Sequence, residues 1–286
     1  MTIPETPVRT SREQFDRQAA HYNAQWNTWT EKTLHWLLEN ADHRPEDTVL
    51  DVATGTGFTA LAFAPHVRSV VGLDVSPGML AEARQKQEAQ ALTNVTWIEG
   101  AAEAMPFPNA SFSLVTTRVA PHHFLSIPQF LAEVKRVLIP GGRFLLADTC
   151  VPDNDPIAAD WQNHVEALRD PSHARNLSPH EWRQALEEAG LTVQELSDPV
   201  GDIAITLNDW MVKAGCTPVQ ETQVRHEFAT APPEAVHAFQ VQLLGNNINT
   251  NIETNSVNDT ENNKDAIEAE DYAFVWQRVV ARATKQ

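Results

Sequence analysis

The sequence contains few cysteines, few basic residues and no long apolar run. Its two cysteines, Cys150 and Cys216, stand far apart and in no metal-ligand spacing, so we expect free thiols in a reducing compartment. No apolar stretch approaches the roughly 20 residues that a membrane-spanning helix needs. Residues 1–10 also lack the apolar centre of a secretory signal. These absences predict a cytoplasmic protein without an integral membrane segment.

The shortage of basic residues leaves the chain strongly acidic. Lysine and arginine together number 21, aspartate and glutamate number 38, and the formal net charge is −17 at pH 7. Such a surface repels both nucleic-acid phosphates and anionic lipid headgroups. We therefore expect a small-molecule partner and no nucleic acid, while the sequence leaves the oligomeric state open.

Strand and helix patterns alternate through the first half of the chain. Apolar strands are predicted at 48–52, 69–74, 95–99, 112–117 and 142–149, and helices at 58–64, 77–89 and 127–138. This order predicts a doubly wound α/β fold, with a parallel sheet of about seven strands and helices on both faces. Right-handed crossovers then place the C-terminal ends of the strands at one edge, where ligands bind.

The flanking regions are predicted to complete one domain. Residues 1–45 form a tail and a helical cap, in which one helix carries an apolar face from Phe15 to Trp29 and a second covers 31–39. Residues 46–150 form the ligand-binding core, and residues 151–286 are the C-terminal part of the same domain.

Several further elements are predicted in that C-terminal part. They are polar loops at 150–177 with two Asp-Pro dipeptides, a helix from the capping box at Ser178 to Gly190, a strand at 191–196, short helices within 203–240, and an edge strand at Tyr272–Ala283. Residues 246–263 hold eight asparagines and no hydrophobic period, which predicts a flexible loop.

The most informative stretch is T-V-L-D-V-A-T-G-T-G, from Thr48 to Gly57. An apolar strand reaches Asp51 there and turns on Gly55 and Gly57, which brings backbone N–H groups to a ligand at the sheet edge. A carboxylate at this place repels a pyrophosphate and attracts a cation. It therefore favours S-adenosylmethionine, which carries a sulfonium and an ammonium, over NAD or ATP.

Other interpretations of these residues stay open. Residues 55–60 also fit the G-x-G-x-x-A dinucleotide fingerprint, with Asp74 near the place of a ribose-binding acid. A strand–loop turn without any ligand has the same appearance. Asp74 can accept hydrogen bonds from ribose hydroxyls or stand solvated at a strand end, and Met79 can pack on an adenine or in the core.

Four motifs in a shared order resemble the class I S-adenosylmethionine-dependent methyltransferases. They are the glycine turn Val49–Gly57, the second-strand acid Asp74, the stretch Gly100–Ser113 (G-A-A-E-A-M-P-F-P-N-A-S-F-S) and the turn Pro140–Gly142; Phe15–Tyr22 also resembles the family's F-x-x-x-A-x-x-Y helix. The likeness is strongest to the ubiquinone/menaquinone-biosynthesis C-methyltransferases, which have a methyltransferase type 11 domain. It implies a Rossmann-like sheet of seven strands.

The resemblance also implies a set of cofactor-binding residues. Asp51 and the glycine turn would hold the methionine end, Asp74 the ribose, and the segment after the third strand the adenine. The full set is Asp51, Ala53, Thr54, Gly55, Gly57, Asp74, Val75, Met79, Ala101, Ala102, Glu103 and Arg118.

Three positions depart from the family pattern. Ala53 replaces a glycine, and Ala101 and Ser113 each replace an aspartate. In the family, the aspartate that matches Ala101 commonly binds the adenine amine. Glu103 or the main chain of Ala102 would have to take over this contact, and we expect a weakened affinity for the cofactor.

The loop after the fourth strand contains the candidate catalytic residues, His122 and His123. A neutral histidine there could take a proton from an acceptor carbon, hydroxyl or amine. The alternative is that both histidines only position the loop, because methyl transfer needs no base when the acceptor is already nucleophilic. The other histidines show no complementary ligand spacing, so no metal site is predicted.

Candidate residues for the acceptor are Tyr22 and Trp26 in the helical cap, and Arg169 and His173 after the fifth strand. Core or lid packing is the alternative role for the tryptophan, and a solvated helix and loop with internal ion pairs is the alternative for the last two. The sequence thus predicts methyl transfer from S-adenosylmethionine to a small molecule, of which a quinone is one candidate. The alternatives are a catalytically silent S-adenosylmethionine-binding protein and an NAD(P)-dependent oxidoreductase.

Overall fold

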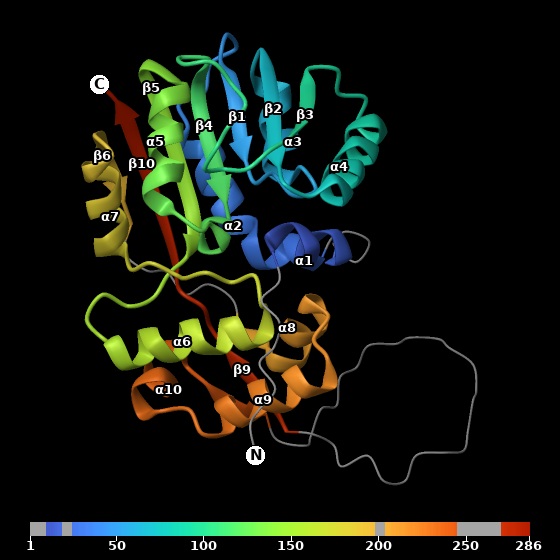
Figure 1. Ribbon diagram of the computed structural model, residues 1–286, viewed down its shortest axis with the longest axis vertical. Helices are drawn as coiled ribbons and strands as arrows, with labels where there is room; N and C mark the ends of the chain where they lie inside the picture. Colours follow the sequence, from blue (N-terminus) through green and yellow to red (C-terminus); the bar gives the residue numbers. More distant parts are fainter. Residues whose placement is uncertain (1–9, 19–24, 198–203, 245–269) are drawn as a thin grey trace, which may run out of the picture.

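A seven-stranded sheet in the order β3-β2-β1-β4-β5-β10-β6 forms the larger part of the molecule (Figure 1). The computed structural model describes residues 10–18, 25–197, 204–244 and 270–286. The first five strands run parallel and confirm the doubly wound fold; they are β1 (Thr48–Val52), β2 (Ser69–Asp74), β3 (Val95–Glu99), β4 (Phe112–Arg118) and β5 (Leu138–Thr149).

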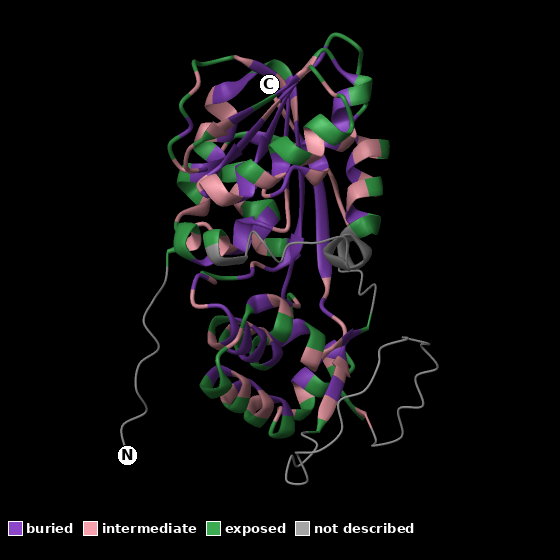
Figure 2. Ribbon diagram, turned by 90° about the vertical axis from the view of Figure 1, so that its right-hand side faces the viewer, coloured by how far each residue is buried: buried purple, intermediate pink, exposed green. Residues whose placement is uncertain are grey.

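Helices cover both faces of this sheet, as predicted from the alternation. One face packs against α2 (Gln25–Asn40), α3 (Phe58–Phe63) and α4 (Pro77–Ala89), and the other against α5 (Ile127–Val137) and α7 (Pro179–Glu188). Neighbouring residues of β1 divide between the two cores, because side chains alternate along a strand: Val49 joins one and Leu50 the other. The strands β1, β2 and β4 between these layers are largely buried (Figure 2).

The C-terminal strand lies inside the sheet, and the prediction of one edge strand at Tyr272–Ala283 is wrong. β10 (Arg278–Lys285) pairs antiparallel with β5 on one side and with β6 (Leu191–Leu196) on the other. The preceding β9 (Asp271–Phe274) belongs to a separate three-stranded sheet. A continuous apolar pattern across 272–283 hides this break, because both segments are buried in different cores.

The loop predicted at 150–177 contains the helix α6 (Pro156–Arg169), which corrects that prediction. Its two Asp-Pro dipeptides mark the two ends of the helix. Asp155 is the N-cap, accepts a hydrogen bond from the Ala158 N–H and is followed by proline at the first helical position, while Asp170 is the C-cap. Asp-Pro is as compatible with a helix start as with a turn.

A smaller unit lies beyond the C-terminal ends of the parallel strands (Figure 1). It combines α6 with α8 (Leu207–Ala214), α9 (Pro218–Ala229), α10 (Pro233–Phe239) and the sheet β7-β9-β8, in which β7 is Ile205–Thr206 and β8 is Gln242–Leu244. Its core is largely aromatic, with Trp161, Trp210, Phe228 and Trp276 in mutual edge or tilted contact.

The N-terminal cap differs from its prediction. α1 (Ser11–Gln18) is short, and the segments that contain Trp26 and Trp29 belong to α2 together with the predicted second helix. α1 is attached to the start of α4, because Asp16 accepts hydrogen bonds from the Ser76 hydroxyl (2.6 Å) and the Gly78 N–H (3.1 Å). Tyr22 and the asparagine-rich segment 246–263 lie outside the described residues.

Candidate active site

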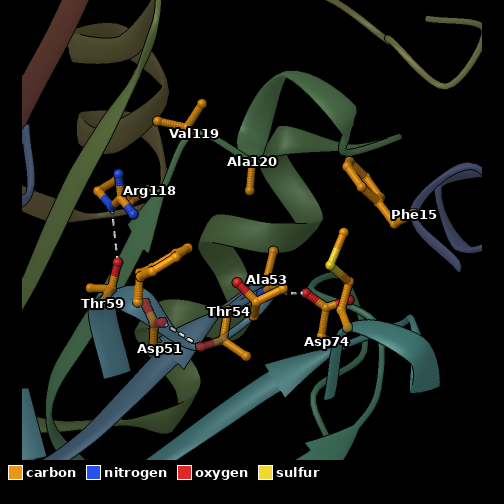
Figure 3. A pocket seen from close by; sticks show the side chains of 13 residues that line it. Phe15, Asp51, Ala53, Thr54, Thr59, Asp74, Arg118, Val119 and Ala120 are labelled. Atoms are coloured by element: carbon orange, nitrogen blue, oxygen red, sulfur yellow. Dashed lines mark hydrogen bonds between the residues drawn. The ribbon is translucent and has the colours of Figure 1, made fainter. Parts of the chain in front are cut away.

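A cleft opens at the C-terminal edge of the sheet, where the strand order reverses between β1 and β4. Its inner compartment is lined by Phe15, Asp51, Ala53, Thr54, Gly55, Thr56, Phe58, Thr59, Asp74, Met79, Arg118, Val119 and Ala120 (Figure 3). Its outer compartment is lined by Thr10, Ser11, Arg12, Phe15, Ala53, Asp74, Val75, Gly100, Ala101, Ala102, Glu103, Ala120, His123, Phe124 and Leu125. The two compartments share Phe15, Ala53, Asp74 and Ala120, and so form one continuous site.

Asp51 is a buried carboxylate at the floor of the inner compartment. It accepts hydrogen bonds from the Thr54 hydroxyl (2.6 Å) and the Thr116 hydroxyl (2.8 Å), one on each oxygen. Burial raises the pKa of Asp51 to about 6, although these two hydrogen bonds lower it. Neutral donors thus hold the carboxylate in place. A cationic ligand would offset the desolvation cost of this buried negative charge.

Asp74 ends β2 and lies where the two compartments meet. Its carboxylate accepts the Gly55 N–H (2.8 Å) on one oxygen and the Ser76 N–H (2.9 Å) on the other. Burial raises the pKa of Asp74 to about 6, against the lowering effect of the backbone hydrogen bonds. The acid therefore fastens the glycine turn to β2 and still faces the cleft, as a ribose-binding group must.

The glycine turn requires left-handed backbone at three positions. Ala53, Gly55 and Gly57 have φ angles of 53°, 53° and 84°. Glycine tolerates this conformation, whereas an alanine carries a steric cost of about 1–2 kcal/mol. Ala53 therefore bears strain at the position that is glycine in the resembling family, and it does so on the wall of the site.

Arg118 provides the positive charge in the inner compartment. Its Nε donates to the Thr59 hydroxyl (3.0 Å), and its charge lowers the pKa of Asp51. A negative and a positive side chain in one compartment match a zwitterionic amino-acid group, with the ammonium toward Asp51 and the carboxylate toward Arg118. This pair supports the methionine end of the predicted cofactor.

The outer compartment contains the residues that were predicted for the adenine. Val75 and the turn Ala101–Glu103 line it, and Glu103 accepts the Leu125 N–H (2.8 Å) across the rim. Ala101 leaves no side-chain acceptor at its own position. Glu103, one of the two substitutes predicted for the adenine contact, lines this compartment with one carboxylate oxygen engaged by Leu125.

The neighbouring histidines His122 and His123 have different surroundings. His123 lines the outer compartment, with its ring edge-on to Phe15 at a centroid distance of 4.9 Å and its Nδ1 3.1 Å from the Ser172 carbonyl oxygen. His122 is buried outside that lining, with Nδ1 2.7 Å from an Asp148 oxygen. Burial, followed by the charge of His122, lowers the pKa of His123 to about 4. Burial also lowers the pKa of His122, but the charge and hydrogen bond of Asp148, with the charges of Glu166 and Asp170, raise it above its ordinary value.

The predicted acceptor residues do not gather at the cleft. Arg169 donates through Nε to the Trp210 carbonyl (2.9 Å) and packs over the Trp210 ring, inside the smaller unit. His173 faces Asn163 and Glu166, and neither it nor Arg169 lines the two compartments. Trp26 belongs to α2, but its side chain, like Tyr22, lies outside the described residues.

Several residues of the site escaped the sequence analysis, and Thr116 and Phe15 are the two with the clearest roles. Thr116 donates a hydrogen bond to the second oxygen of Asp51. In the sequence, only its position two residues before the end of β4 indicates that it lies near the site. Phe15 was recognised as part of an apolar helix face, yet it extends from α1 into both compartments (Figure 3). A helix pattern predicts a buried face without saying which partner covers it.

Comparison with known proteins agrees with this geometry. The family described as a methyltransferase domain matches residues 50–146. A Bacillus subtilis protein, "Uncharacterized methyltransferase YcgJ", is 33% identical over 237 residues, which cover 83% of this chain and 92% of the relative. The chain belongs to the class I S-adenosylmethionine-dependent methyltransferases.

Solved and curated relatives of this methyltransferase extend the likeness. The crystal structure of YcgJ superposes with a TM-score of 0.78 at 29% identity and covers 90% of this chain and 99% of that one. A demethylmenaquinone methyltransferase of Symbiobacterium thermophilum is 35% identical over 161 residues, which are 52% of this chain and 62% of the relative. Among the helices that the structure describes, none combines the length and hydropathy needed to cross a bilayer.

The affinity of the methyltransferase for its cofactor is expected to fall below pH 6. Only the ionised form of Asp51 attracts the ammonium, and the unliganded carboxyl has a pKa of about 6. Between pH 7 and pH 5, its protonation should weaken binding about ten-fold, and the protonation of Asp74 adds to the loss. Calorimetric titration with S-adenosylhomocysteine, which keeps the ammonium, measures this dependence.

Asp51 and Asp74 should affect the stability of the unliganded protein in the opposite direction: their contribution to the free energy of unfolding rises as the pH falls, whereas cofactor affinity decreases. Both carboxyl pKa values are raised above the ordinary 3.8, so their contribution to stability is complete below about pH 4 and is lost as the pH rises through 6.

Asp51→Asn should flatten the pH dependence of binding. An affinity that stays constant from pH 7 to pH 5 would contradict the assignment of the ammonium to Asp51.

Proposed function

We propose that this methyltransferase methylates a small, largely apolar acceptor, quinol-like in shape, at the junction of the two compartments. The observation that carries the proposal is the lining of that junction. Phe15, Ala53 and Ala120 border both compartments, and His123 stands beside Phe15. Asp74 also borders both compartments and is assigned to the ribose, so an acceptor there would meet mainly an aromatic ring, two methyl groups and one imidazole.

The positions of the cofactor residues support this site for the acceptor. Asp51 and Arg118 lie at the inner end, and Ala101–Glu103 lie at the outer end. A ligand that spans the cleft between these ends carries its sulfonium near the junction, beside Asp74. When bound, S-adenosylmethionine supplies an electrophilic methyl group there.

The chain itself contributes orientation and the exclusion of water. Holding two reactants in line and in contact accounts for a large part of the rate in such transfers. Apolar walls favour a step in which the positive charge of the sulfonium is lost, because they solvate the charged ground state poorly. Phe15 and Ala120 provide such walls, and α1 is held in place through Asp16.

His123 is the residue we propose as the proton acceptor. Its Nδ1 lies 3.1 Å from the Ser172 carbonyl oxygen, which can only accept a hydrogen bond, so the ring proton belongs on Nδ1. The Nε2 atom then carries the lone pair and can take a proton from an acceptor hydroxyl or ring carbon. His122, whose Nδ1 is engaged by Asp148, would position the loop.

An acceptor screen tests the proposed function. The purified protein with S-adenosylmethionine should methylate reduced naphthoquinones that lack the ring methyl group, detected as S-adenosylhomocysteine and as a mass gain of one methyl group. His123→Gln should lower kcat about 100-fold with little change in the KM for the cofactor. His226→Gln, on α9 away from the cleft lining, is the matched control.

Two outcomes would overturn parts of this proposal. Turnover of His123→Gln at the wild-type rate removes the residue from proton transfer. Methylation of amines or carboxylates of similar size, with none of the quinols, would show that the acceptor class is wrong while the methyltransferase assignment stands.

A further inference from the structure

Three buried side chains with metal-binding atoms meet behind the cleft wall. His122 comes from the turn η3 (Pro121–His123), Glu166 from α6, and His173 from the loop that follows α6. One nitrogen of each histidine and one oxygen of Glu166 lie within 4.8 Å of one another. The side chain of His173 is 1% exposed, and that of Glu166 is 8% exposed.

His173 lacks a hydrogen-bond partner for one of its nitrogens. Its Nε2 lies 3.1 Å from Oδ1 of Asn163, and the same oxygen accepts the Asn176 N–H at 2.7 Å. This backbone donor fixes Oδ1 as the acceptor, so Nε2 of His173 carries the proton and Nδ1 carries a lone pair. That Nδ1 is fully buried, has no hydrogen-bond partner, and lies 3.6 Å from Oε2 of Glu166.

Two groups that both offer lone pairs therefore face each other without a proton between them. The other oxygen of Glu166 is already occupied, because Gln162 and Asn176 each donate an amide N–H to Oε1 at 3.0 Å. Gln162 in turn leaves its own Oε1 buried without a partner. A buried site with excess acceptors and no donor is stabilised by a cation.

His122 has the surroundings typical of a metal ligand. Asp148 accepts from its Nδ1 at 2.7 Å and from its backbone N–H at 3.0 Å. A carboxylate in this place fixes the orientation and tautomer of a histidine and leaves the second ring nitrogen to a metal. The backbone adds support, because the Ala174 and Arg175 N–H groups both donate to the His122 carbonyl.

We propose that His122, Glu166 and His173 bind one divalent transition-metal ion, with zinc as the first candidate. Two imidazole nitrogens and one carboxylate oxygen suit zinc and its neighbours and do not suit magnesium or calcium, which prefer oxygen ligands. Tetrahedral zinc at bond lengths of about 2.0–2.1 Å brings its ligand atoms to about 3.3 Å from one another. The 3.6 Å between His173 Nδ1 and Glu166 Oε2 is close to this value, whereas the cluster as a whole, whose ligand atoms lie within 4.8 Å of one another, must contract around the ion.

The proposed ion has a structural role. It connects α6 and its following loop, in the smaller unit, with the turn η3, which also carries His123 on the cleft wall. This cluster was not predictable from the sequence, because His122 lies more than 40 residues from the other two ligands and the spacing between Glu166 and His173 resembles no known ligand motif.

Zinc binding by the full-length chain tests the proposal. After treatment with a chelator and its removal, the protein should take up about one equivalent of Zn²⁺ in competition with a chromophoric chelator. Thermal unfolding should shift to higher temperature with Zn²⁺, because the ion binds only the folded chain. Substitution with Co²⁺ should give the strong visible bands of a tetrahedral site.

Variants locate the ion. Glu166→Gln and His173→Gln should weaken Zn²⁺ binding by more than about 100-fold, and Asp148→Asn by about 10- to 100-fold. His164→Gln is the matched control. His164 lies on α6, as Glu166 does, but its side chain pairs with Glu227 away from the cluster. Circular dichroism confirms that each variant is folded.

Three results would overturn the proposal. They are the absence of stoichiometric uptake by the wild-type chain, uptake that Glu166→Gln leaves unchanged, and a Co²⁺ spectrum typical of an octahedral site on the surface. None of these measurements depends on methyl transfer, so the failure of the proposed acceptor leaves this test intact.

Discussion

Replacement of Asp51 by asparagine is expected to weaken the binding of S-adenosylmethionine by about 2–4 kcal/mol, or about 30- to 1,000-fold. Asparagine keeps the size of the side chain and removes the charge. One threonine hydroxyl can still donate to its Oδ1, and the other must turn to accept from its Nδ2. The ligand ammonium would then be desolvated without an ionic partner. Calorimetric titration with S-adenosylhomocysteine at about pH 7.5, above the pKa of about 6 of Asp51, measures the loss.

The stability of the variant separates lost binding from lost structure. Since burial raises the pKa of Asp51, the neutral asparagine should leave the unliganded protein at least as stable as the wild type at pH 7. Asp47→Asn is the matched control. Asp47 is also buried beside β1, but it pairs with Arg143 at 2.6 Å at the end of the strand away from the cleft.

The control and the variant should give opposite results. Asp47→Asn should lower the free energy of unfolding and leave cofactor affinity unchanged, because it breaks a buried ion pair outside the site. Cofactor affinity that survives Asp51→Asn undiminished would show that the ammonium is bound elsewhere, and the electrostatic basis of the site assignment would fail.

Replacement of Gly57 by alanine is expected to lower the free energy of unfolding by about 2–4 kcal/mol. Two penalties combine at this position. The φ angle of 84° disfavours any side chain, and a Cβ atom there would lie 2.6 Å from Cη2 of Trp97. Trp97 cannot easily move away, because its ring is also packed over Gly72 and its Nε1 donates to Gln87 at 2.6 Å.

Gly55→Ala provides the comparison within the same turn. Gly55 has a φ angle of 53°, but a Cβ atom there would meet nothing within 4 Å, so only the backbone penalty of about 1 kcal/mol applies. Chemical denaturation of the two variants measures the difference. Equal destabilisation would mean that the contact with Trp97 adds nothing and that the turn is sensitive to backbone conformation alone.

The first half of the fold was predictable because its signals are local. Each parallel strand from β1 to β4 is a short apolar run with turn residues at its ends, and the Ser76 cap followed by Pro77 defines the start of α4. β5 begins at Leu138, four residues before its predicted start, because the turn residues Pro140–Gly142 lie within the strand. The errors arose where one local pattern serves two structures. Asp155-Pro156 was interpreted as a loop and begins α6, and the apolar run 272–283 was interpreted as one strand and is divided between two sheets.

The part of the site that lies at the ends of the parallel strands was also predictable from the sequence. Asp51, Asp74 and the glycine turn converge because the topology of a parallel sheet brings successive strand ends to one edge. The separate surroundings of His122 and His123 could not be predicted, because they depend on Asp148 and Ser172, which lie 26 and 49 residues away. Arg169 and His173 were predicted to contact the acceptor because of their charge, and charge alone does not say which way a side chain points.

The position of β10 has a consequence for the order of folding. Residues 278–285 are the last strand of the chain and fill the gap between β5 and β6. Until residues 278–285 are in place, both neighbours present open backbone edges, which are prone to pair with other chains. The central layer therefore closes late in folding, because the pairing of β10 with β5 joins parts of the chain more than 100 residues apart.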